Sequence, residues 1–317
     1  MPPPPVRPTD FVSILQQIWW RLDVALDLEM IRWSAMLGAL EALECGTTAI
    51  VDHHESPSTI EGSLTVIADA CATVGVRSCL AYGVTDRHGP DGARRGLAEN
   101  SRYLRGGGRG MVGVHAAFTC SQDTLEAAAG LAADLGVGVH IHVAEGAVDA
   151  GAGLRLAGLA RDDWLLVHCV HLDRDLPGTI AHNPRSNMNN SVGYARPAGR
   201  PNPVVLGTDG IGADMIEEFR LAYARHREDD VSASPLVAWS WLQAGYRLVP
   251  EAASDEVVWD RPGAGDPWWA AFTTGIRARD VTVAGEKVLR DGIATRVDAD
   301  EVRAKAAEQA ARLFARL

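Results

Sequence analysis

Short apolar runs recur along most of the chain, and each one ends in polar or charged residues. Seven of these runs have the length and residue types of β-strands: TTAIVDHH, VRSCLAYGVTD, MVGVHAAFT, VGVHIHVAE, WLLVHCVHL, TIAHNP and PVVLGTDG. Apolar residues at helical spacing fill the early gaps, as in Ile60, Leu64, Ile67, Ala68 and Cys71. Strands that alternate with helices predict βαβ units and a parallel sheet.

The number of strands and the chain length together favour an α/β barrel of the TIM type. Such a barrel has eight strands and takes about 250 residues, and this chain of 317 residues shows seven runs. We expect residues 1–250 to form the barrel, which would then lack its first strand. Residues 251–317 contain short strands, a hairpin turn at 284–286 and a final amphipathic helix. They predict a small β appendage closed by that helix, the remnant of a β-sandwich.

The chain begins with a proline-rich stretch, residues 1–8, which predicts an extended arm. A helix is expected after Thr9 or Asp10, where Trp19 and Trp20 would serve packing. A second helix should run from Asp27 to a stop at Cys45-Gly46.

Composition and charge narrow the class of protein. Hydrophobic residues make up 47% and charged residues 22%, and no run of about 18 apolar residues occurs, so a membrane-spanning chain is not expected. The net charge of -11 disfavours nucleic-acid binding, which needs clustered basic residues. Five cysteines without a CxxC pair indicate free thiols and a reducing cytoplasm.

Chemically active side chains gather at the ends of the predicted strands. Eight of the ten histidines lie in or just after these strands, and Asp209 ends the run PVVLGTDG. The carboxyl ends of barrel strands form the active-site mouth, so these residues are expected to meet there. For Asp209 alone, an ordinary turn or helix cap is the alternative reading.

The segment His140-Ile-His142-Val-Ala-Glu145 is the sharpest local signal. His140 and His142 share one face of a strand, and Glu145 stands just beyond its end. Imidazole and carboxylate groups are ligands of zinc-like metals, and a carboxylate beside the metal can carry protons. The alternative is a packed histidine pair with a surface glutamate.

The motifs GTTAIVDHH, HIHVAE, HCVHL, HNPRSNMNN and LGTDGIGADM occur in this order. They resemble the amidohydrolase superfamily, in its aminohydrolase and chlorohydrolase branch of cyclic-amidine deaminases. They are most similar to aminohydrolases linked to selenium-dependent purine or pyrimidine catabolism. The resemblance implies a distorted (β/α)8 barrel with a β-sandwich and one catalytic divalent metal, zinc or else iron.

The same resemblance implies roles for individual residues. It makes His142 and Asp209 metal ligands, Glu145 the proton shuttle, His168 a catalytic group that orients the water or polarises the substrate, and Asp209 also the acceptor of the water proton. Candidates for contact with the substrate are His53, His115, His182, Arg185 and Asn187.

The chain departs from this family in one motif. Members bring two metal ligands as His-x-His on the first strand, and no such motif precedes His142. We therefore expect a missing N-terminal segment, zinc binding well below one ion per chain, and association through unpaired strand edges.

The resulting hypothesis is a metal-dependent hydrolase that deaminates an aminated heterocycle such as a purine, pyrimidine or pterin. Its partner would be this small molecule, and homo-oligomers are compatible with the sequence. Two alternatives stay open. One is a chlorohydrolase acting on a halogenated ring, and the other is a truncated noncatalytic homologue that binds a small molecule or a partner.

Overall fold

A computed structural model describes residues 6–317, so the arm expected over residues 1–8 falls largely outside the described part. Seven parallel strands follow one another in sequence order, as predicted. They are β1 (Ala49–His54), β2 (Arg77–Tyr82), β3 (Val112–Ala116), β4 (Val139–Val143), β5 (Leu165–His168), β6 (Thr179–His182) and β7 (Val204–Leu206). Backbone hydrogen bonds between Leu80 or Val84 and the β3 segment join β1–β2 to β3–β7.

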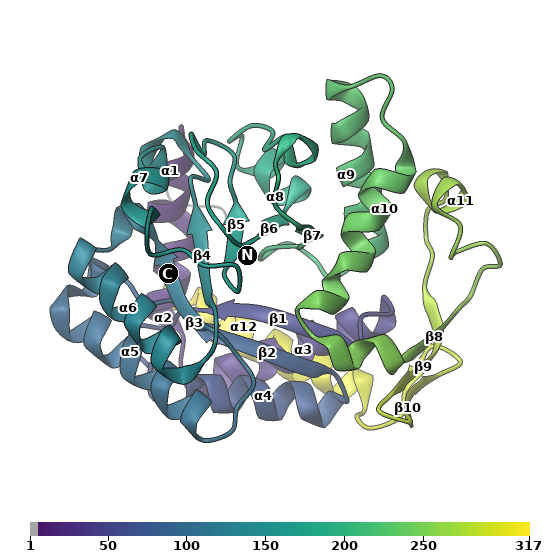
Figure 1. The fold of residues 1–317 in the computed structure, drawn as a ribbon. Helices are drawn as coiled ribbons and strands as arrows, with labels where there is room; N and C mark the ends of the chain where they lie inside the picture. The colour runs from purple at the N-terminus through teal and green to yellow at the C-terminus, as the bar shows by residue number, and fades with distance from the viewer. Residues whose placement is uncertain (1–5) are drawn as a thin grey trace.

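Helices cover the outside of this curved sheet (Figure 1). Those between and after the strands are α4 (Ser63–Val74), α5 (Gly89–Arg105), α6 (Gln122–Leu135), α7 (Ala152–Leu156), α8 (Pro184–Asn189), α9 (Met215–Asp229) and α10 (Pro235–Gln243). No helix connects β5 to β6, as the short gap of residues 173–178 predicts. Short 3₁₀ turns occur at Asp86–His88, Ala117–Thr119, Ala147–Asp149, Pro197–Gly199, Ala244–Arg247 and Pro250–Ser254.

Two apolar layers hold the strands in place. Alternate residues of the strands point inward and form a small inner cluster, made by Leu165, Val167, Ala181 and Val205 with Val51 packed against it. The opposite faces pack against the helices, where Val139, Ile141 and Val143 of β4 are fully buried. The β-type alternation therefore places every second strand residue inside the barrel, and His53, His115, His140 and His142 share that face.

The N-terminal helix crosses the carboxyl ends of the strands. It consists of α1 (Phe11–Ile14), a π-helical turn (Leu15–Trp19) and α2 (Trp20–Ala25), and Asp10 caps it. The ring of Phe11 packs on Gly146 after β4, and Trp19 lies beside Gly210 after β7. The next helix, α3 (Leu28–Glu44), is capped by Asp27 and ends at Cys45 and a left-handed Gly46, as predicted.

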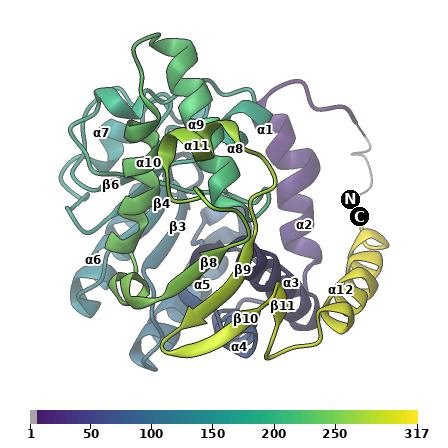
Figure 2. The ribbon, with the colours of Figure 1, turned by 90° about the vertical axis from the view of Figure 1, so that its right-hand side faces the viewer.

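The C-terminal part forms a separate antiparallel sheet. Its strands β8 (Glu256–Trp259), β9 (Ala278–Val283), β10 (Glu286–Arg290) and β11 (Ile293–Ala294) lie in the order β11-β10-β9-β8, with the short α11 (Pro267–Phe272) between β8 and β9. The last helix, α12 (Ala299–Phe314), packs on α3 and lies near α2 (Figure 2). The sheet confirms the β appendage, while a domain boundary near residue 250 stays a prediction. Over residues 6–317, no helix combines the length and apolar character needed to span a membrane.

Candidate active site

The carboxyl ends of the parallel strands carry the residues that the sequence singled out. His53 lies on β1, His115 on β3, and His140 and His142 on β4. His168 is the last residue of β5, and Glu145 and Asp209 follow β4 and β7 by two and three positions. Segments far apart in the sequence therefore contribute side chains to one site at the mouth of the barrel.

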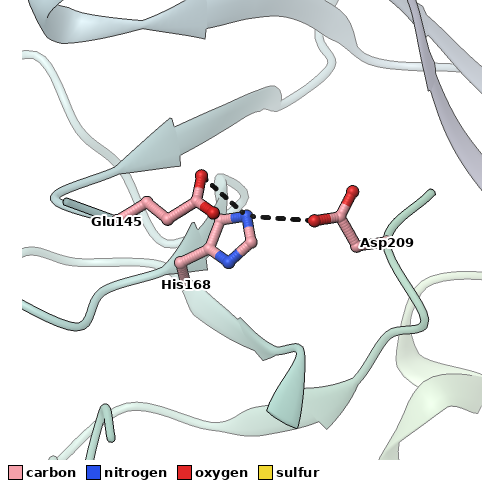
Figure 3. Close-up of side chains that lie close together, drawn as sticks. All are labelled: Glu145, His168 and Asp209. Carbon is pink, nitrogen blue, oxygen red and sulfur yellow. Dashed lines mark ion pairs between the residues drawn. The ribbon is translucent and has the colours of Figure 1, made fainter. Parts of the chain in front are cut away.

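Glu145, His168 and Asp209 form the closest group. His168 Nε2 lies 3.4 Å from Glu145 Oε2 and 3.7 Å from Asp209 Oδ2, so the two carboxylates flank one ring nitrogen (Figure 3). One ligand atom from each residue lies within 4.8 Å of the others. Both His168 and Asp209 have left-handed backbone conformations, with φ of 72° and 53°. Such strain in non-glycine residues is concentrated at functional sites, where the surrounding fold holds it in place.

Hydrogen bonds at Nδ1 show that this nitrogen carries a proton in two histidines. His142 Nδ1 lies 2.7 Å from the backbone oxygen of His115, which can only accept, so Nδ1 is protonated and Nε2 is free. His168 Nδ1 lies 2.8 Å from Asn187 Oδ1, which likewise accepts. In this amide orientation, Nδ1 of His168 donates to Asn187 and Nε2 faces the two carboxylates.

Burial holds the pKa values of His53, His140 and His142 below the ordinary value for histidine. Desolvation, followed by the neighbouring His142, His140 and His115, places the pKa of His53 well below its ordinary value. Desolvation also lowers the pKa of His140 to about 3 and lowers that of His142. Desolvation acts to raise the pKa of Asp209, but His168, His142 and the Ser186 hydroxyl outweigh it, so this pKa is lowered. The site thus combines imidazoles whose pKa values are lowered by burial with an aspartate whose pKa is lowered by its neighbours.

These residues fit a divalent metal. A nitrogen lone pair that faces two carboxylates is unfavourable unless a proton or a cation lies between them. Imidazole nitrogen and carboxylate oxygen are ligands that zinc accepts. The buried Nε2 of His53 also lacks a hydrogen-bond partner among residues 6–317, with the ring of His142 4.6 Å away between centroids. His142 itself lies outside the closest group, although its ring centroid is 5.5 Å from that of His168.

The predicted substrate contacts occupy different surroundings. His53 Nδ1 is 2.8 Å from His140 Nδ1, and His115 Nδ1 is 2.8 Å from the Thr119 hydroxyl. His182 is fully buried against Tyr194 and Trp241.

The remaining two predicted contacts are engaged with protein groups. Arg185 binds Glu217 and Glu218 of α9, and Asn187 binds His168. Contact of all five residues with a substrate stays a prediction.

Other residues at the site were missed by sequence reasoning. Ser186 and Asn190 hydrogen-bond Asp209 and Glu145; they belong to the segment HNPRSNMNN, whose polar residues were the available signal. Trp20, expected only to pack, lies with its ring centroid 6.3 Å from that of His115, and the guanidinium of Arg87 stacks 4.2 Å from the Trp20 ring. Nothing in the local sequence indicates that the N-terminal helix reaches this mouth.

Imidazoles and carboxylates gathered at the carboxyl ends of the strands of a parallel α/β barrel are typical of metal-dependent hydrolases. The sequence model of the amidohydrolase family matches residues 8–240. The chain belongs to this family, which confirms the resemblance to the amidohydrolases and the barrel fold. The link to selenium-dependent catabolism and the missing N-terminal segment stay predictions.

Curated relatives of the chain are deaminases. The 5'-deoxyadenosine deaminase of Methanopyrus kandleri is 30% identical over an alignment that covers 94% of this chain and 80% of the relative. The 5-methylthioadenosine/S-adenosylhomocysteine deaminase of Pelotomaculum thermopropionicum is 35% identical over 66% of this chain. The match spans only about half, 53%, of that second relative's length.

Solved structures share the fold. An adenosine deaminase from Xanthomonas campestris with bound zinc superposes with a TM-score of 0.82 at 19% identity, over 98% of this chain and 81% of that chain. Atrazine chlorohydrolase from Arthrobacter aurescens TC1, complexed with zinc, gives a TM-score of 0.76 at 20% identity, over 95% and 82%.

Proposed function

We propose that this protein is a metal-dependent deaminase that hydrolyses the exocyclic C–N bond of an aminated heterocycle. The reaction replaces a ring amino group with oxygen from water and releases ammonia. The observation that carries the proposal is the group of Glu145, His168 and Asp209, whose ligand atoms lie within 4.8 Å at the barrel mouth. Their chemistry matches proton transfer and water activation at an electrophilic carbon.

Each residue has a separate task in this proposal. Glu145 carries a proton to the ring nitrogen next to the reacting carbon, and His168 orients the attacking water. Asp209 takes the proton from that water, for which it must be ionised, and its lowered pKa keeps it so. A zinc ion held by His142 and Asp209, with His168 and Glu145 beside it, would lower the pKa of the water and polarise the substrate.

The substrate class follows from the relatives. Two of them are named for adenosine derivatives, 5'-deoxyadenosine and 5-methylthioadenosine or S-adenosylhomocysteine. We propose an adenine nucleoside or a similar amino-substituted ring for this chain. The five cysteines all lie within residues 6–317 and are free thiols, and on this ground we propose a reducing compartment, the cytoplasm.

The test measures ammonia release from adenosine, 5'-deoxyadenosine, methylthioadenosine, aminopyrimidines and pterins, with chloride release from a chlorotriazine measured alongside. Asp209→Asn should lower the rate roughly 10²–10⁴-fold, because the amide cannot take a proton. Glu286→Gln makes the matching acid-to-amide change in the appendage, where Glu286 pairs with the exposed Arg296 across 3.4 Å, and should leave the rate unchanged.

Full activity of Asp209→Asn would refute the assignment. Chloride release without ammonia release would favour the chlorohydrolase, and turnover of neither class would favour the noncatalytic homologue.

A further inference from the structure

The short helix α8 and its C-cap residue, Asn190, contact all three members of the close group. Ser186, Asn187 and Asn190 are almost fully buried, with 1%, 1% and 5% of their surfaces exposed. Ser186 Oγ donates to Asp209 Oδ2 across 2.5 Å, and Asn187 Oδ1 accepts from His168 Nδ1 across 2.8 Å. Asn190 Nδ2 donates to Glu145 Oε1 across 3.0 Å. One element therefore contacts the proposed base, the proposed shuttle and the histidine between them.

The helical spacing explains how so short a segment reaches three targets. Residues 186 and 190 are four apart and lie on the same face, and Asn190 N donates to the backbone oxygen of Ser186 across 2.8 Å. Asn187 is one position further around the helix and faces β5. Burying polar atoms costs free energy unless hydrogen bonds compensate for it. The hydrogen bonds of these buried side chains are therefore part of what keeps the segment in place.

A buried carboxylate anchors the helix from behind. Glu218 of α9 is fully buried and accepts hydrogen bonds from both the backbone N–H and Nε of Arg185, at 2.9 and 3.1 Å. Arg185 immediately precedes Ser186, so this contact fixes the start of the segment that faces the site.

We propose that Ser186, Asn187 and Asn190 are positioning residues, each orienting one group of the deaminase site. This proposal rests on the proposed function. Asn187 Oδ1 accepts from His168 Nδ1 and so orients the ring with Nε2 toward the two carboxylates. Ser186 fixes one oxygen of Asp209, whose other oxygen accepts from Gly210 N across 2.6 Å. Asn190 holds Glu145 Oε1 and leaves Oε2 facing His168. All three side chains are uncharged, so they orient these groups without changing the net charge of the site.

Two identical substitutions give the sharpest test. Asn187→Asp keeps an acceptor for His168 Nδ1, and Asn187 Nδ2 has no hydrogen-bond partner to lose among residues 6–317. Asn190→Asp removes the donor to Glu145 and places two carboxylates together. We expect Asn187→Asp to keep most of kcat and Asn190→Asp to lose roughly 10–100-fold, the range for outer partners of metal-site ligands.

Removing each side chain completes the set. Ser186→Ala and Asn187→Leu should lower kcat by roughly 10–100-fold while KM changes little, because the groups they orient act in the chemical step. Met188→Ala is the control on the same helix, since Met188 is 41% exposed, and it should leave kcat and KM unchanged. Circular dichroism and thermal melting establish that each variant is folded.

A spectroscopic measurement separates positioning from a structural role. Nitrogen-15 NMR of histidine-labelled protein, with the His168 signal assigned by its loss in His168→Gln, should show the Nδ1–H tautomer in the wild type and in Asn187→Asp. Asn187→Leu should lose this preference. An unchanged tautomer in Asn187→Leu, or equal kcat for Asn187→Asp and Asn190→Asp, would overturn the proposal.

Failure of the function is distinguishable from failure of the positioning role. A wild-type protein that releases no ammonia from the whole panel refutes the proposed deaminase. The tautomer of His168 and the affinity for Zn²⁺, measured by calorimetry for the wild type, Ser186→Ala and Met188→Ala, still decide the role of α8. Weaker Zn²⁺ binding only in Ser186→Ala supports that role, and equal binding in all three proteins contradicts it for Asp209.

Discussion

His168 shows how much a single residue depends on its neighbours. Its sequence context placed it at the end of a strand, and the structure places its Nε2 between Glu145 and Asp209 while Asn187 engages its Nδ1. Several other histidines are buried in neutral form. Desolvation lowers the pKa of His54 to about 4 and that of His182 to about 3.

These lowered values predict a loss of stability in acid. The unfolded chain takes up protons on these histidines near pH 6.5, whereas the folded protein does so only near pH 3 to 4. Their contribution to stability is therefore present above pH 6.5 and is lost as the pH falls toward 4. Each histidine contributes a slope of up to about 1.4 kcal/mol per pH unit in that window.

Urea unfolding at pH 7.5, 6.5 and 5.5 measures this slope. His182→Leu should reduce this slope by up to about 1.4 kcal/mol per pH unit, the contribution of one proton. His182 is fully buried, and both of its ring nitrogens lack partners among residues 6–317. A free energy of unfolding that is constant across this range would contradict the prediction.

At the scale of the elements, close approach between strands requires glycine at their starts. Gly138 precedes β4, and a Cβ at this position would lie 1.8 Å from the backbone oxygen of Asp163, next to the start of β5. Gly130, in the middle of α6, has open space around the same position. The packing of β4 against β5 therefore requires glycine at position 138, whereas nothing near Gly130 excludes a larger residue. The two positions are only eight residues apart.

Replacing each glycine by alanine should have opposite effects on stability. Gly138→Ala forces the backbone of β4 away from its neighbour and should destabilise the protein by about 1–3 kcal/mol, the usual range for overpacking. Gly130→Ala should stabilise it by roughly 0.5–1 kcal/mol, because alanine loses less conformational entropy in a helix. Denaturant midpoints of the two variants and the wild type provide the measurement, and equal shifts in one direction would refute it.

At the scale of the whole molecule, the barrel sheet has two edge strands, β1 and β7. β1 pairs with β2 and β7 pairs with β6, and no ladder between β1 and β7 occurs within residues 6–317. Val51 of β1 nevertheless packs into the inner cluster that contains Val205 of β7. The barrel interior is thus shared across this gap although its hydrogen bonding is open.

Open strand edges predict self-association. Unpaired backbone groups on a mostly apolar strand are a template for pairing with another chain. We expect light scattering after size-exclusion chromatography to show oligomers whose population grows with protein concentration. A monodisperse monomer that melts cooperatively would contradict this expectation and show that side-chain packing closes the barrel.

The sequence by itself determined the seven parallel strands, the antiparallel appendage and the positions of Glu145, His168 and Asp209 at or just beyond strand ends. These features follow from local periodicity and from the rule that parallel strands present their carboxyl ends together. Only the tertiary structure decided which side chains meet. Ser186, Asn187 and Asn190 reach partners 23, 19 and 45 positions away, and Trp20 reaches a histidine on β3. Such contacts depend on how helices pack over the strand ends, and no local pattern in the chain encodes that packing.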